Sequence, residues 1–346
     1  MASLFYLLND LVQGLRGTNT TFLTDKEVPG ADLTGKWIII TGANNGIGFE
    51  AAKSFATWGA NIILGCREPP EWEQHPTAAV KECNEIAQAH GHSSTIEWWP
   101  VDMADLETVE AFAQRWIATG NPLDILCNNA GIAVAPLNAK TKDGFHPVHQ
   151  INYLSHVLLT LRLLPSLAEQ NPGRIVCTTS CYHHLGTYNP DLESSATQEG
   201  NPYRDNKLFY QMWLTELQLR LLRHPSYKGI TVNGVNPGFV SSSIWTPVKQ
   251  INGRSLQFLL SYVAITPQQG SLAVTYAATS PEFGPNPKTQ GIGAPNGLGG
   301  GRYINRIWDA TPKRHVNDPE LRSQVWIKTA EKLKLSEKGL LDVLGL

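Results

Sequence analysis

Short apolar runs alternate with segments of helical periodicity along most of this chain. The apolar runs cover residues 37–40, 60–66, 96–102, 123–127, 174–179 and 229–235. Continuous apolar runs of this length, bounded by glycine or polar residues, are typical of strands that are buried on both faces of a sheet. Between them, apolar residues recur at helical spacing over residues 46–57, about 76–90, 105–118, 146–170 and 203–223. The pattern therefore predicts alternating strands and helices.

This alternation implies right-handed βαβ units, in which parallel strands form one sheet and helices cover both of its faces. We predict an α/β fold with a single Rossmann-type, doubly wound parallel sheet, which occupies residues 33–346 and ends in a C-terminal tail. Residues 302–304 are predicted to form a last strand. Asp318 and Pro319 fit the N-cap and the first position of a final helix.

Residues 1–32 are predicted to form an amphipathic helix and a connector. The helix has an apolar stripe made by Leu4, Leu7, Leu8, Leu11, Val12 and Leu15. An isolated helix of about 12 residues is unstable in water, so the stripe must dock on its own domain, on a second subunit of a homo-oligomer, or on a lipid surface. Its polar side carries little Lys or Arg, which favours protein over a peripheral membrane contact. No run of about 18 apolar residues predicts a transmembrane segment.

Composition narrows the class of protein. Of the 346 residues, 42% are hydrophobic and 17% are charged, which excludes disorder as the main state. The formal net charge of −2 provides no electrostatic footprint for nucleic acid. The five cysteines form no CxxC pair and are predicted to be buried, reduced thiols of a cytoplasmic protein. His183 and His184 are expected at a loop surface, and no spacing of ligand residues predicts a metal site.

The first predicted strand runs into a glycine-rich turn, residues 41–48, which opens a helix. Gly42 would allow the tight turn, Gly46 would let the backbone approach a pyrophosphate, and Gly48 would let the helix pack close to the sheet. The N–H groups and the positive dipole end of the helix would face the phosphates. The turn, with Asn45 and Ile47 between its glycines, is therefore predicted to bind a dinucleotide.

The second predicted strand should end beside the adenosine ribose of this cofactor. Cys66 stands where an NAD-type site has its carboxylate, and Arg67 follows it. Because an Arg suits the 2′-phosphate of NADP, we predict that Arg67 holds this phosphate. The alternative is that Arg67 is only solvated and that Glu68 recognises the ribose of NAD.

Polar and small residues also follow the third and fourth predicted strands. Asp102 is placed to accept a hydrogen bond from the adenine amino group, or equally to cap the next helix, although Asp105 is better placed as a cap. The fourth predicted strand ends in the segment Asn128, Asn129, Ala130 and Gly131. Its small residues would let the backbone pass close to a flat ligand.

A tyrosine and a lysine supply the candidate acid–base chemistry. Tyr203 and Lys207 are four residues apart in a helical pattern, so their side chains share one face. An ammonium beside a phenol is expected to lower the pKa of Tyr203 toward neutrality, which would make it a proton donor and acceptor. Ser180 follows the fifth strand at the same sheet edge, where its hydroxyl could polarise a carbonyl oxygen. Asn152 lies inside a predicted helix, where Asn is unfavourable, so a hydrogen-bonding role is expected.

In this order, the motifs resemble those of the short-chain dehydrogenase/reductase family over about residues 33–283. The matching segments are TGANNGIG (41–48), NNAG (128–131), Asn152, Ser180, YRDNK (203–207) and NPGFVSS (236–242). The resemblance is to the subgroup of retinol dehydrogenases and WW-domain oxidoreductases, here without WW domains. GRY (301–303) and DPEL (318–321) also look like that subgroup.

The resemblance implies roles for the candidate residues. Tyr203 would be the general acid/base, Lys207 would tune its pKa and bind the nicotinamide ribose, and Ser180 would orient the carbonyl. Asn152 would hold a water that links Lys207 to solvent. Further cofactor contacts are implied for Pro237, Gly238, Val240 and Ser242. The stretch between Ser180 and Tyr203 is longer than is usual in the family, which bears on substrate shape.

We therefore predict an NADP(H)-dependent oxidoreductase that moves a hydride between the nicotinamide and a carbonyl or secondary-alcohol carbon. The apolar residues 244–263 are expected to form a lid over a lipophilic small-molecule substrate, the alternative being ordinary helix-to-sheet packing. Two other functions fit the fold, a non-redox isomerase and a catalytically silent NADP(H)-binding partner protein. A silent protein needs no lysine-tuned tyrosine, so the residues favour the oxidoreductase.

Overall fold

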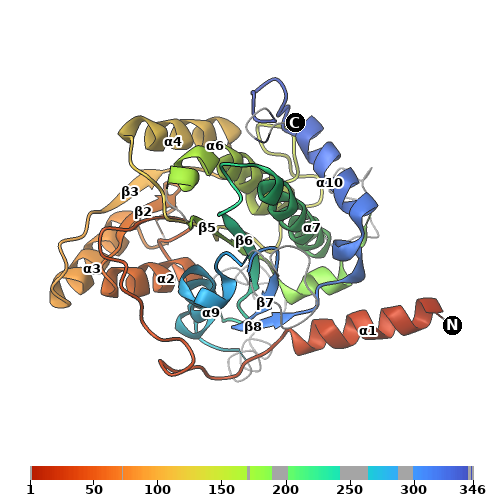
Figure 1. Cartoon of the computed structure of the whole chain (residues 1–346), viewed down its shortest axis with the longest axis horizontal. Helices are drawn as coiled ribbons and strands as arrows, with labels where there is room; N and C mark the ends of the chain where they lie inside the picture. Colours follow the sequence, from red (N-terminus) through yellow and green to blue (C-terminus); the bar gives the residue numbers. More distant parts are fainter. Residues whose placement is uncertain are drawn as a thin grey trace.

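The computed structural model describes residues 2–71, 73–169, 172–188, 202–241, 264–286, 299–341 and 344. Its strands are β1 (Trp37–Thr41), β2 (Asn61–Cys66), β3 (Ile96–Pro100), β4 (Ile125–Asn128), β5 (Arg174–Thr178), β6 (Thr231–Asn236), β7 (Tyr303–Asn305) and β8 (Trp308–Ala310). They form one sheet in the order β3-β2-β1-β4-β5-β6-β7-β8 (Figure 1). All neighbours are parallel except β7 and β8. The predicted α/β, doubly wound fold is therefore confirmed.

Helices cover both faces of this sheet. They are α2 (Gly46–Thr57), α3 (Pro76–Ala89), α4 (Leu106–Thr119), α6 (Ser155–Glu169), α7 (Pro202–Arg223), α9 (Pro267–Thr279) and α10 (Pro319–Lys332). Asp105 caps α4 by accepting from the N–H groups of Glu107 and Thr108. Asp318 caps α10 in the same way, and Pro319 is the first residue of that helix, as predicted.

The strands β1, β2, β4 and β5 carry apolar runs because both faces of the sheet are buried there. Along β1, Ile38 and Ile40 belong to the core under α2, α3 and α9. Ile39, between them, belongs to the core under α4, α6, α7 and α10. All three side chains have no exposed surface. The chain order reverses between β1 and β4, which is where doubly wound sheets bind ligands.

Two elements differ from the prediction. The helix expected over 146–170 consists of a single turn, α5 (Pro147–His149), a π-helical segment, η1 (Gln150–Leu154), and then α6. A π segment widens the helix locally, and such segments often occur at functional sites. The last predicted strand is present as β7, but β8 was not predicted, and it pairs antiparallel with β7.

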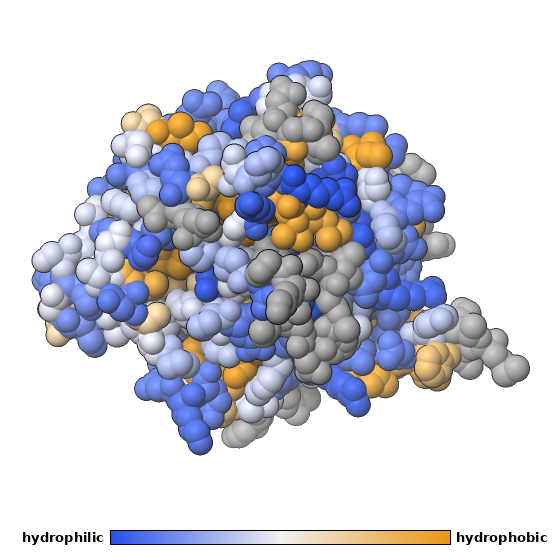
Figure 2. All heavy atoms as spheres, in the orientation of Figure 1, coloured by the Kyte–Doolittle hydropathy of each residue, from blue (hydrophilic) through white to orange (hydrophobic). Residues whose placement is uncertain are grey.

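The N-terminal helix forms, as α1 (Ala2–Arg16), but its apolar stripe does not dock on its own domain. Its apolar side chains are 43% to 65% exposed at Leu7, Leu8, Leu11, Val12 and Leu15. Figure 1 shows α1 reaching away from the body of the molecule, and Figure 2 shows apolar atoms exposed along it. Of the partners considered for the stripe, its own domain is excluded, because the opposite side of α1, with Asp10 and Gly14, is the buried one.

The connector after α1 packs on the domain. Leu23 and Val28 are buried with Ile307, and the Gln269 side chain bonds both the N–H and the carbonyl of Leu23 at 2.9 Å. Within the described ranges, no helix combines the length and apolar character needed to cross a membrane. All five cysteines are buried and free, as predicted.

The prediction that His183 and His184 lie at a loop surface is wrong. Both belong to the short helix η2 (Cys181–Leu185) and are at most 2% exposed. Their rings contact Tyr303 of β7, with centroids 4.5 and 5.8 Å away. α1 packs on the same short helix. The burial therefore comes from segments that are distant in the sequence.

Candidate active site

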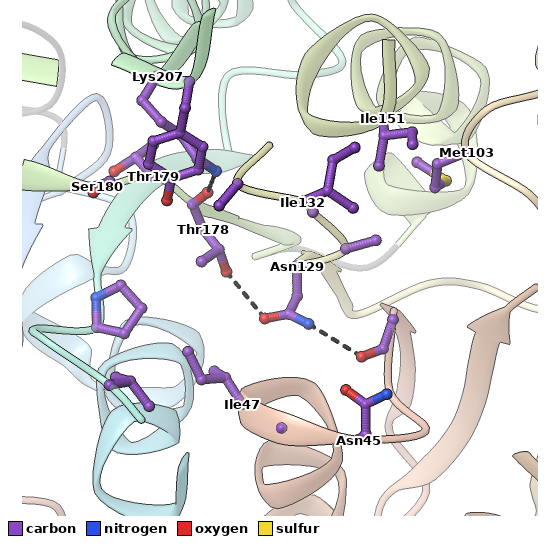
Figure 3. A pocket seen from close by; sticks show the side chains of 18 of the residues that line it. Asn45, Ile47, Met103, Asn129, Ile132, Ile151, Thr178, Thr179, Ser180 and Lys207 are labelled. Atoms are coloured by element: carbon purple, nitrogen blue, oxygen red, sulfur yellow. Dashed lines mark hydrogen bonds between the residues drawn. The ribbon is translucent and has the colours of Figure 1, made fainter. Parts of the chain in front are cut away.

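A cavity of about 820 Å³ opens at the carboxyl ends of the strands (Figure 3). Most predicted site residues line it, namely Gly42, Asn45, Gly46, Ile47, Arg67, Asp102, Asn129, Ala130, Gly131, Ser180, Tyr203, Lys207, Pro237, Gly238 and Val240. Gly48, Asn128 and Asn152 do not line it. Ser242 and the expected lid over 244–263 lie outside the described residues.

The glycine-rich turn brings backbone to one side of this cavity. Gly42 has a φ of +65°, and a Cβ there would lie 2.9 Å from the Ala130 Cα. A Cβ on Gly48 would lie 2.4 Å from the Gly42 carbonyl oxygen, so Gly48 serves close packing. The first residues of α2, Gly46 and Ile47, line the cavity. A glycine cradle at a helix N-terminus fits the pyrophosphate of a dinucleotide.

Hydrogen bonds link the two sides of the cavity (Figure 3). Asn129 Nδ2 donates to the carbonyls of Thr41 and Gly42 at 3.0 and 3.3 Å. Thr178 Oγ1 donates to Asn129 Oδ1 at 3.3 Å, and Lys207 Nζ donates to the Thr178 carbonyl at 2.7 Å. The lysine is thereby oriented relative to the glycine-rich turn. Asn128 faces the interior instead, where its Nδ2 donates to Thr160 Oγ1 at 2.8 Å.

Ser180, Tyr203 and Lys207 meet on one wall of the cavity. α7 places the Lys207 Nζ 5.5 Å from the centroid of the Tyr203 ring. Ser180, which follows β5, forms a hydrogen bond with Tyr203. Both Ser180 and Lys207 are less than 10% exposed, at 8% and 4%. The arrangement brings one hydroxyl, one phenol and one ammonium to the same point.

The expected lowering of the Tyr203 pKa is not what the structure shows. Burial raises the pKa of Tyr203, and the Ser180 hydrogen bond opposes this only in part. Burial also lowers the pKa of Lys207 to about 8, and its ammonium is engaged by the Thr178 carbonyl. The phenol is therefore protonated at neutral pH, a state that suits a proton donor.

Asn152 lies in the π segment η1 and is fully buried. Its Oδ1 accepts from the Ile132 N–H and its Nδ2 donates to the Ile132 carbonyl, both at 2.8 Å. The side chain therefore anchors the segment after β4, whose residues Ile132 and Ala133 line the cavity. A hydrogen-bonding role was expected for Asn152, but this backbone partner was not.

At the far end of the cavity, Arg67 forms an ion pair that the sequence did not reveal. Arg67 Nη2 lies 2.8 Å from Glu73 Oε1, and both residues line the cavity. The alternative carboxylate, Glu68, is 70% exposed, contacts His75 Nε2 at 3.0 Å, and does not line the cavity. A cation and a carboxylate therefore stand together where the adenosine ribose is expected.

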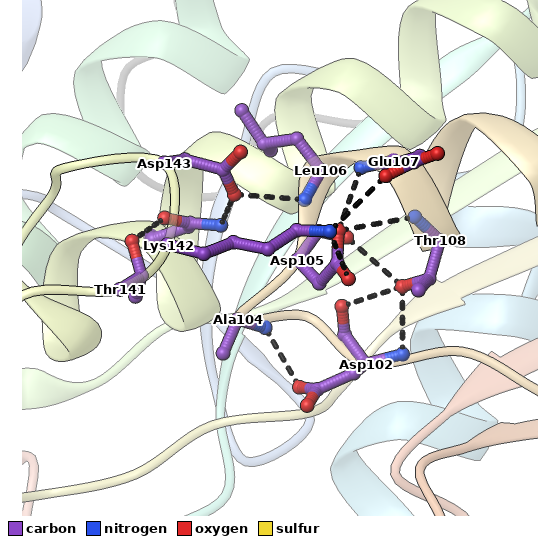
Figure 4. A network of polar contacts seen from close by, with 10 residues as sticks. Asp102, Ala104, Asp105, Leu106, Glu107, Thr108, Thr141, Lys142 and Asp143 are labelled. Carbon is purple, nitrogen blue, oxygen red and sulfur yellow. Dashed lines mark hydrogen bonds and ion pairs between the residues drawn. The ribbon is translucent and has the colours of Figure 1, made fainter.

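A polar network supports the neighbouring wall (Figure 4). Asp102 lines the cavity and accepts from the Ala104 N–H at 2.8 Å, whereas Asp105 caps α4. Lys142 pairs with Asp105 at 2.6 Å and with Glu107 at 3.2 Å. These bonds tie the loop before α5 to the start of α4. The same loop begins with residues that line the cavity.

The remaining lining is largely apolar. It includes Val101, Met103, Ile132, Ala133, Val134, Ile151 and Phe239. Figure 3 shows Met103, Ile132 and Ile151 gathered on one side, away from Ser180. Thr18, from the N-terminal connector, also lines the cavity and was not predicted. In the described part of the chain, no cluster of His, Cys, Asp and Glu could hold a metal ion.

Comparison with known proteins identifies relatives of this chain. The model of the short chain dehydrogenase family matches residues 36–252. Polyprenol dehydrogenase of Mus musculus is 30% identical over 311 residues, which are 88% of this chain and 85% of that protein. The WW domain-containing oxidoreductase of Homo sapiens is 30% identical and covers 91% of this chain and 70% of its own length. Retinol dehydrogenase 11 of Mus musculus is 36% identical, covering 71% and 74%.

Solved structures show the same fold. A putative uncharacterized protein from Mycobacterium paratuberculosis aligns with a TM-score of 0.61 at 24% identity, over 91% of this chain and 98% of its own. L-sorbose reductase from Gluconobacter frateurii, solved with NADPH and L-sorbose, aligns with a TM-score of 0.55 at 21% identity, over 72% and 91%. The chain belongs to the short-chain dehydrogenase/reductase family.

Proposed function

We propose that this member of the family is an NADP(H)-dependent oxidoreductase that interconverts a carbonyl and a secondary alcohol in a lipophilic small molecule. The observation that carries the proposal is the convergence of Ser180, Tyr203 and Lys207 on one wall of the cavity, facing the cradle of the glycine-rich turn. A catalytically silent protein would have no use for a buried phenol and ammonium at a cavity wall, since burying each polar group costs desolvation free energy.

The chain's own residues supply the proton and the orientation. A bound nicotinamide cofactor supplies or accepts the hydride at the reacting carbon. In reduction, the Tyr203 hydroxyl donates its proton to the substrate oxygen, which becomes the alcohol oxygen as the carbon gains the hydride. The Ser180 hydroxyl donates a hydrogen bond to the same oxygen and stabilises its developing charge. The Lys207 ammonium stabilises the phenolate that remains.

The choice of NADP rests on Arg67. Its guanidinium lines the cavity beyond the end of β2, where the adenosine ribose is expected, and it can form charge-assisted hydrogen bonds with a phosphate. Glu73 forms an ion pair with Arg67 there. A 2′-phosphate must therefore compete with the Glu73 carboxylate for the guanidinium. Glu68, by contrast, does not line the cavity.

The lipophilic substrate class rests on the apolar wall around Met103, Ile132 and Ile151. It is also supported by relatives whose names specify polyprenol and retinol dehydrogenases. A wall of this kind gains from burying hydrocarbon, at about 25 cal/mol per Å².

Turnover tests the proposal. Purified protein is incubated with NADPH and a panel of long-chain and cyclic ketones and aldehydes, and loss of NADPH fluorescence is recorded. The matched control for Tyr203→Phe is Tyr276→Phe, which removes the same atom on α9, outside the cavity. We expect turnover in the wild type and in Tyr276→Phe, and a loss of about 10²–10⁴-fold in Tyr203→Phe. Absence of turnover with the whole panel, or full activity of Tyr203→Phe, would contradict the proposal.

A further inference from the structure

The end of the N-terminal segment lies against the loop that carries Ser180. α1 packs on η2, the short helix that starts directly after Ser180. Thr18, two residues beyond α1, lines the cavity. The segment is thus near enough to the site to influence it.

One buried amide side chain joins the N-terminal segment to the loop that carries Ser180. Asn236, the last residue of β6, is 1% exposed. Its Oδ1 accepts from the Cys181 N–H at 3.0 Å, and its Nδ2 donates to the Gly17 carbonyl at 2.7 Å and to Asn305 Oδ1 at 2.9 Å. The residue after Ser180 is therefore bonded, through a single side chain, to the end of the N-terminal helix.

Packing at Gly17 is equally close. A Cβ built on Gly17 would lie 1.9 Å from the Cys181 Cβ, so a side chain there would force one of the two segments to move. One turn earlier, a Cβ on Gly14 would lie 3.6 Å from the Leu185 side chain, which is ordinary contact. Of these two glycine positions, only Gly17, beside Cys181, has no room for a larger residue.

A second attachment holds the other end of the same loop. Lys313 Nζ donates to the carbonyls of His184 and Gly186 at 2.9 and 2.8 Å. It also lies 3.4 Å from Asp10 Oδ2 of α1, and both side chains are 11% exposed. The His183 ring bonds the Ser180 carbonyl at 2.7 Å through Nδ1 and accepts from the Lys313 N–H through Nε2.

The N-terminal segment also reaches the loop of Pro237 and Gly238. Arg306 is fully buried, and its guanidinium donates to the Pro237 carbonyl at 2.9 Å and to the Thr21 carbonyl at 3.1 Å. A Cβ on Gly238 would lie 2.3 Å from the Asn19 carbonyl oxygen. The segment thus touches both loops that flank the reacting groups.

We propose that residues 17–21, which follow α1, act through Asn236 as a brace that positions Ser180 for the reaction. Asn236 and Gly17 are positioning residues. The inference rests on the proposed function, and it predicts that moving the brace lowers the rate through Ser180. A displacement near 1 Å of a reacting group can cost on the order of 10²-fold in rate.

Gly17→Ala and Gly14→Ala make a matched pair of variants in the full-length protein. We expect Gly17→Ala to lower kcat by about 10- to 100-fold with little change in the Kd for NADPH. Gly14→Ala should stay near wild type, because its added methyl has room. Cys181→Gly should partly rescue Gly17→Ala, since it removes the Cβ that the new methyl meets. Equal kcat for the two alanine variants would overturn the brace.

A double-mutant cycle separates positioning from general damage. If the brace acts through Ser180, Gly17→Ala should cost little more in a Ser180→Ala background, because the group it positions is gone. Fully additive losses would overturn the proposal. Asn236→Asp gives an independent variant that keeps an acceptor for the Cys181 N–H but cannot donate to Gly17. We expect a similar loss of kcat from it, and wild-type kcat in Asn236→Asp would count against the brace.

Amide hydrogen exchange tests the brace without relying on turnover. Exchange in residues 181–185 should be faster in Gly17→Ala than in Gly14→Ala or the wild type. Unchanged exchange in this segment would overturn the brace even if the enzyme is active. If exchange rises but the wild type turns over no substrate, the proposed function fails while the structural brace stands.

Discussion

The ion pair between Arg67 and Glu73 allows the preference for NADPH over NADH to be changed by a single conservative substitution. Glu73→Gln replaces a carboxylate oxygen by an amide and removes one negative charge from the place where a 2′-phosphate would bind. Glu68→Gln is the matched control, because Glu68 is 70% exposed and lies outside the cavity. The same chemical change is thus made inside and outside the site.

The magnitude follows from the geometry. The two side chains are 46% and 19% exposed and lie 2.8 Å apart, so breaking the pair costs about 0–1 kcal/mol. A carboxylate near a phosphate adds about 1 kcal/mol of repulsion in a water-like medium, and more where water is excluded. Together, the two effects should make the binding free energy of NADPH more favourable by about 1–2 kcal/mol in Glu73→Gln, which is a roughly 5- to 30-fold lower Kd. NADH should bind equally or up to about tenfold more weakly, because a carboxylate that accepts from the 2′-hydroxyl is lost.

The assay is cofactor binding by protein-to-NAD(P)H fluorescence transfer, titrated for both cofactors and all variants. Arg67→Ala should lose about 1.5–3 kcal/mol of NADPH affinity, or roughly ten- to a hundredfold. The reasoning is refuted if Glu73→Gln leaves the NADPH to NADH ratio unchanged, or if Glu68→Gln shifts it as much.

Three further predictions concern Lys207, acid stability and α1. Replacing Lys207, whose pKa burial lowers to about 8, by Met should reduce activity at neutral pH and shift the pH profile of kcat; an unchanged profile would contradict its role. Burial lowers the pKa of His183 to about 4 from 6.5, so the unfolded state takes up the proton first as pH falls. Its stabilising contribution, about 3 kcal/mol, is present above pH 6.5 and is lost between about pH 6.5 and 4. Melting temperatures of wild type and His183→Asn across this range check it, and equal slopes would be inconsistent with it. The polar side of α1 carries little Lys or Arg, which favours a protein partner over a lipid surface. The exposed stripe should therefore pair with a second copy of this chain. Leu7→Gln with Leu11→Gln should then lower the sedimenting mass, whereas a monomeric wild type that floats with vesicles would indicate a lipid partner.

Local signals in the sequence predicted the elements that position the site. The apolar runs that became β1, β2, β4 and β5 reflect burial on both faces of the sheet. The glycine-rich turn could be interpreted because each glycine meets a backbone constraint of its own turn, as Gly42 and Gly48 do. Tyr203 and Lys207 share a helix, so their spacing alone placed them together.

Contacts between distant segments could not be predicted in this way. Glu73 reaches the cavity from the irregular segment after β2, with no periodicity to place it. His183 and His184 look like loop residues until Tyr303, Lys313 and α1 cover them. The raised pKa of Tyr203 depends on burial, which the spacing to Lys207 does not reveal. Thr18 lines the cavity because contacts with distant segments, such as the Asn236 bond to Gly17, hold the N-terminal segment there.

Transfer of a labelled hydride tests the central claim most directly. The protein is incubated with NADPH deuterated at C4 of the nicotinamide and with a lipophilic ketone that supports NADPH consumption, and the product is analysed by mass spectrometry. We predict an alcohol that gains one deuterium at the former carbonyl carbon, from one face of the nicotinamide only, at a rate that falls about 10²–10⁴-fold in Tyr203→Phe. A product without deuterium, or an isomerised substrate with the cofactor unchanged, would contradict the account.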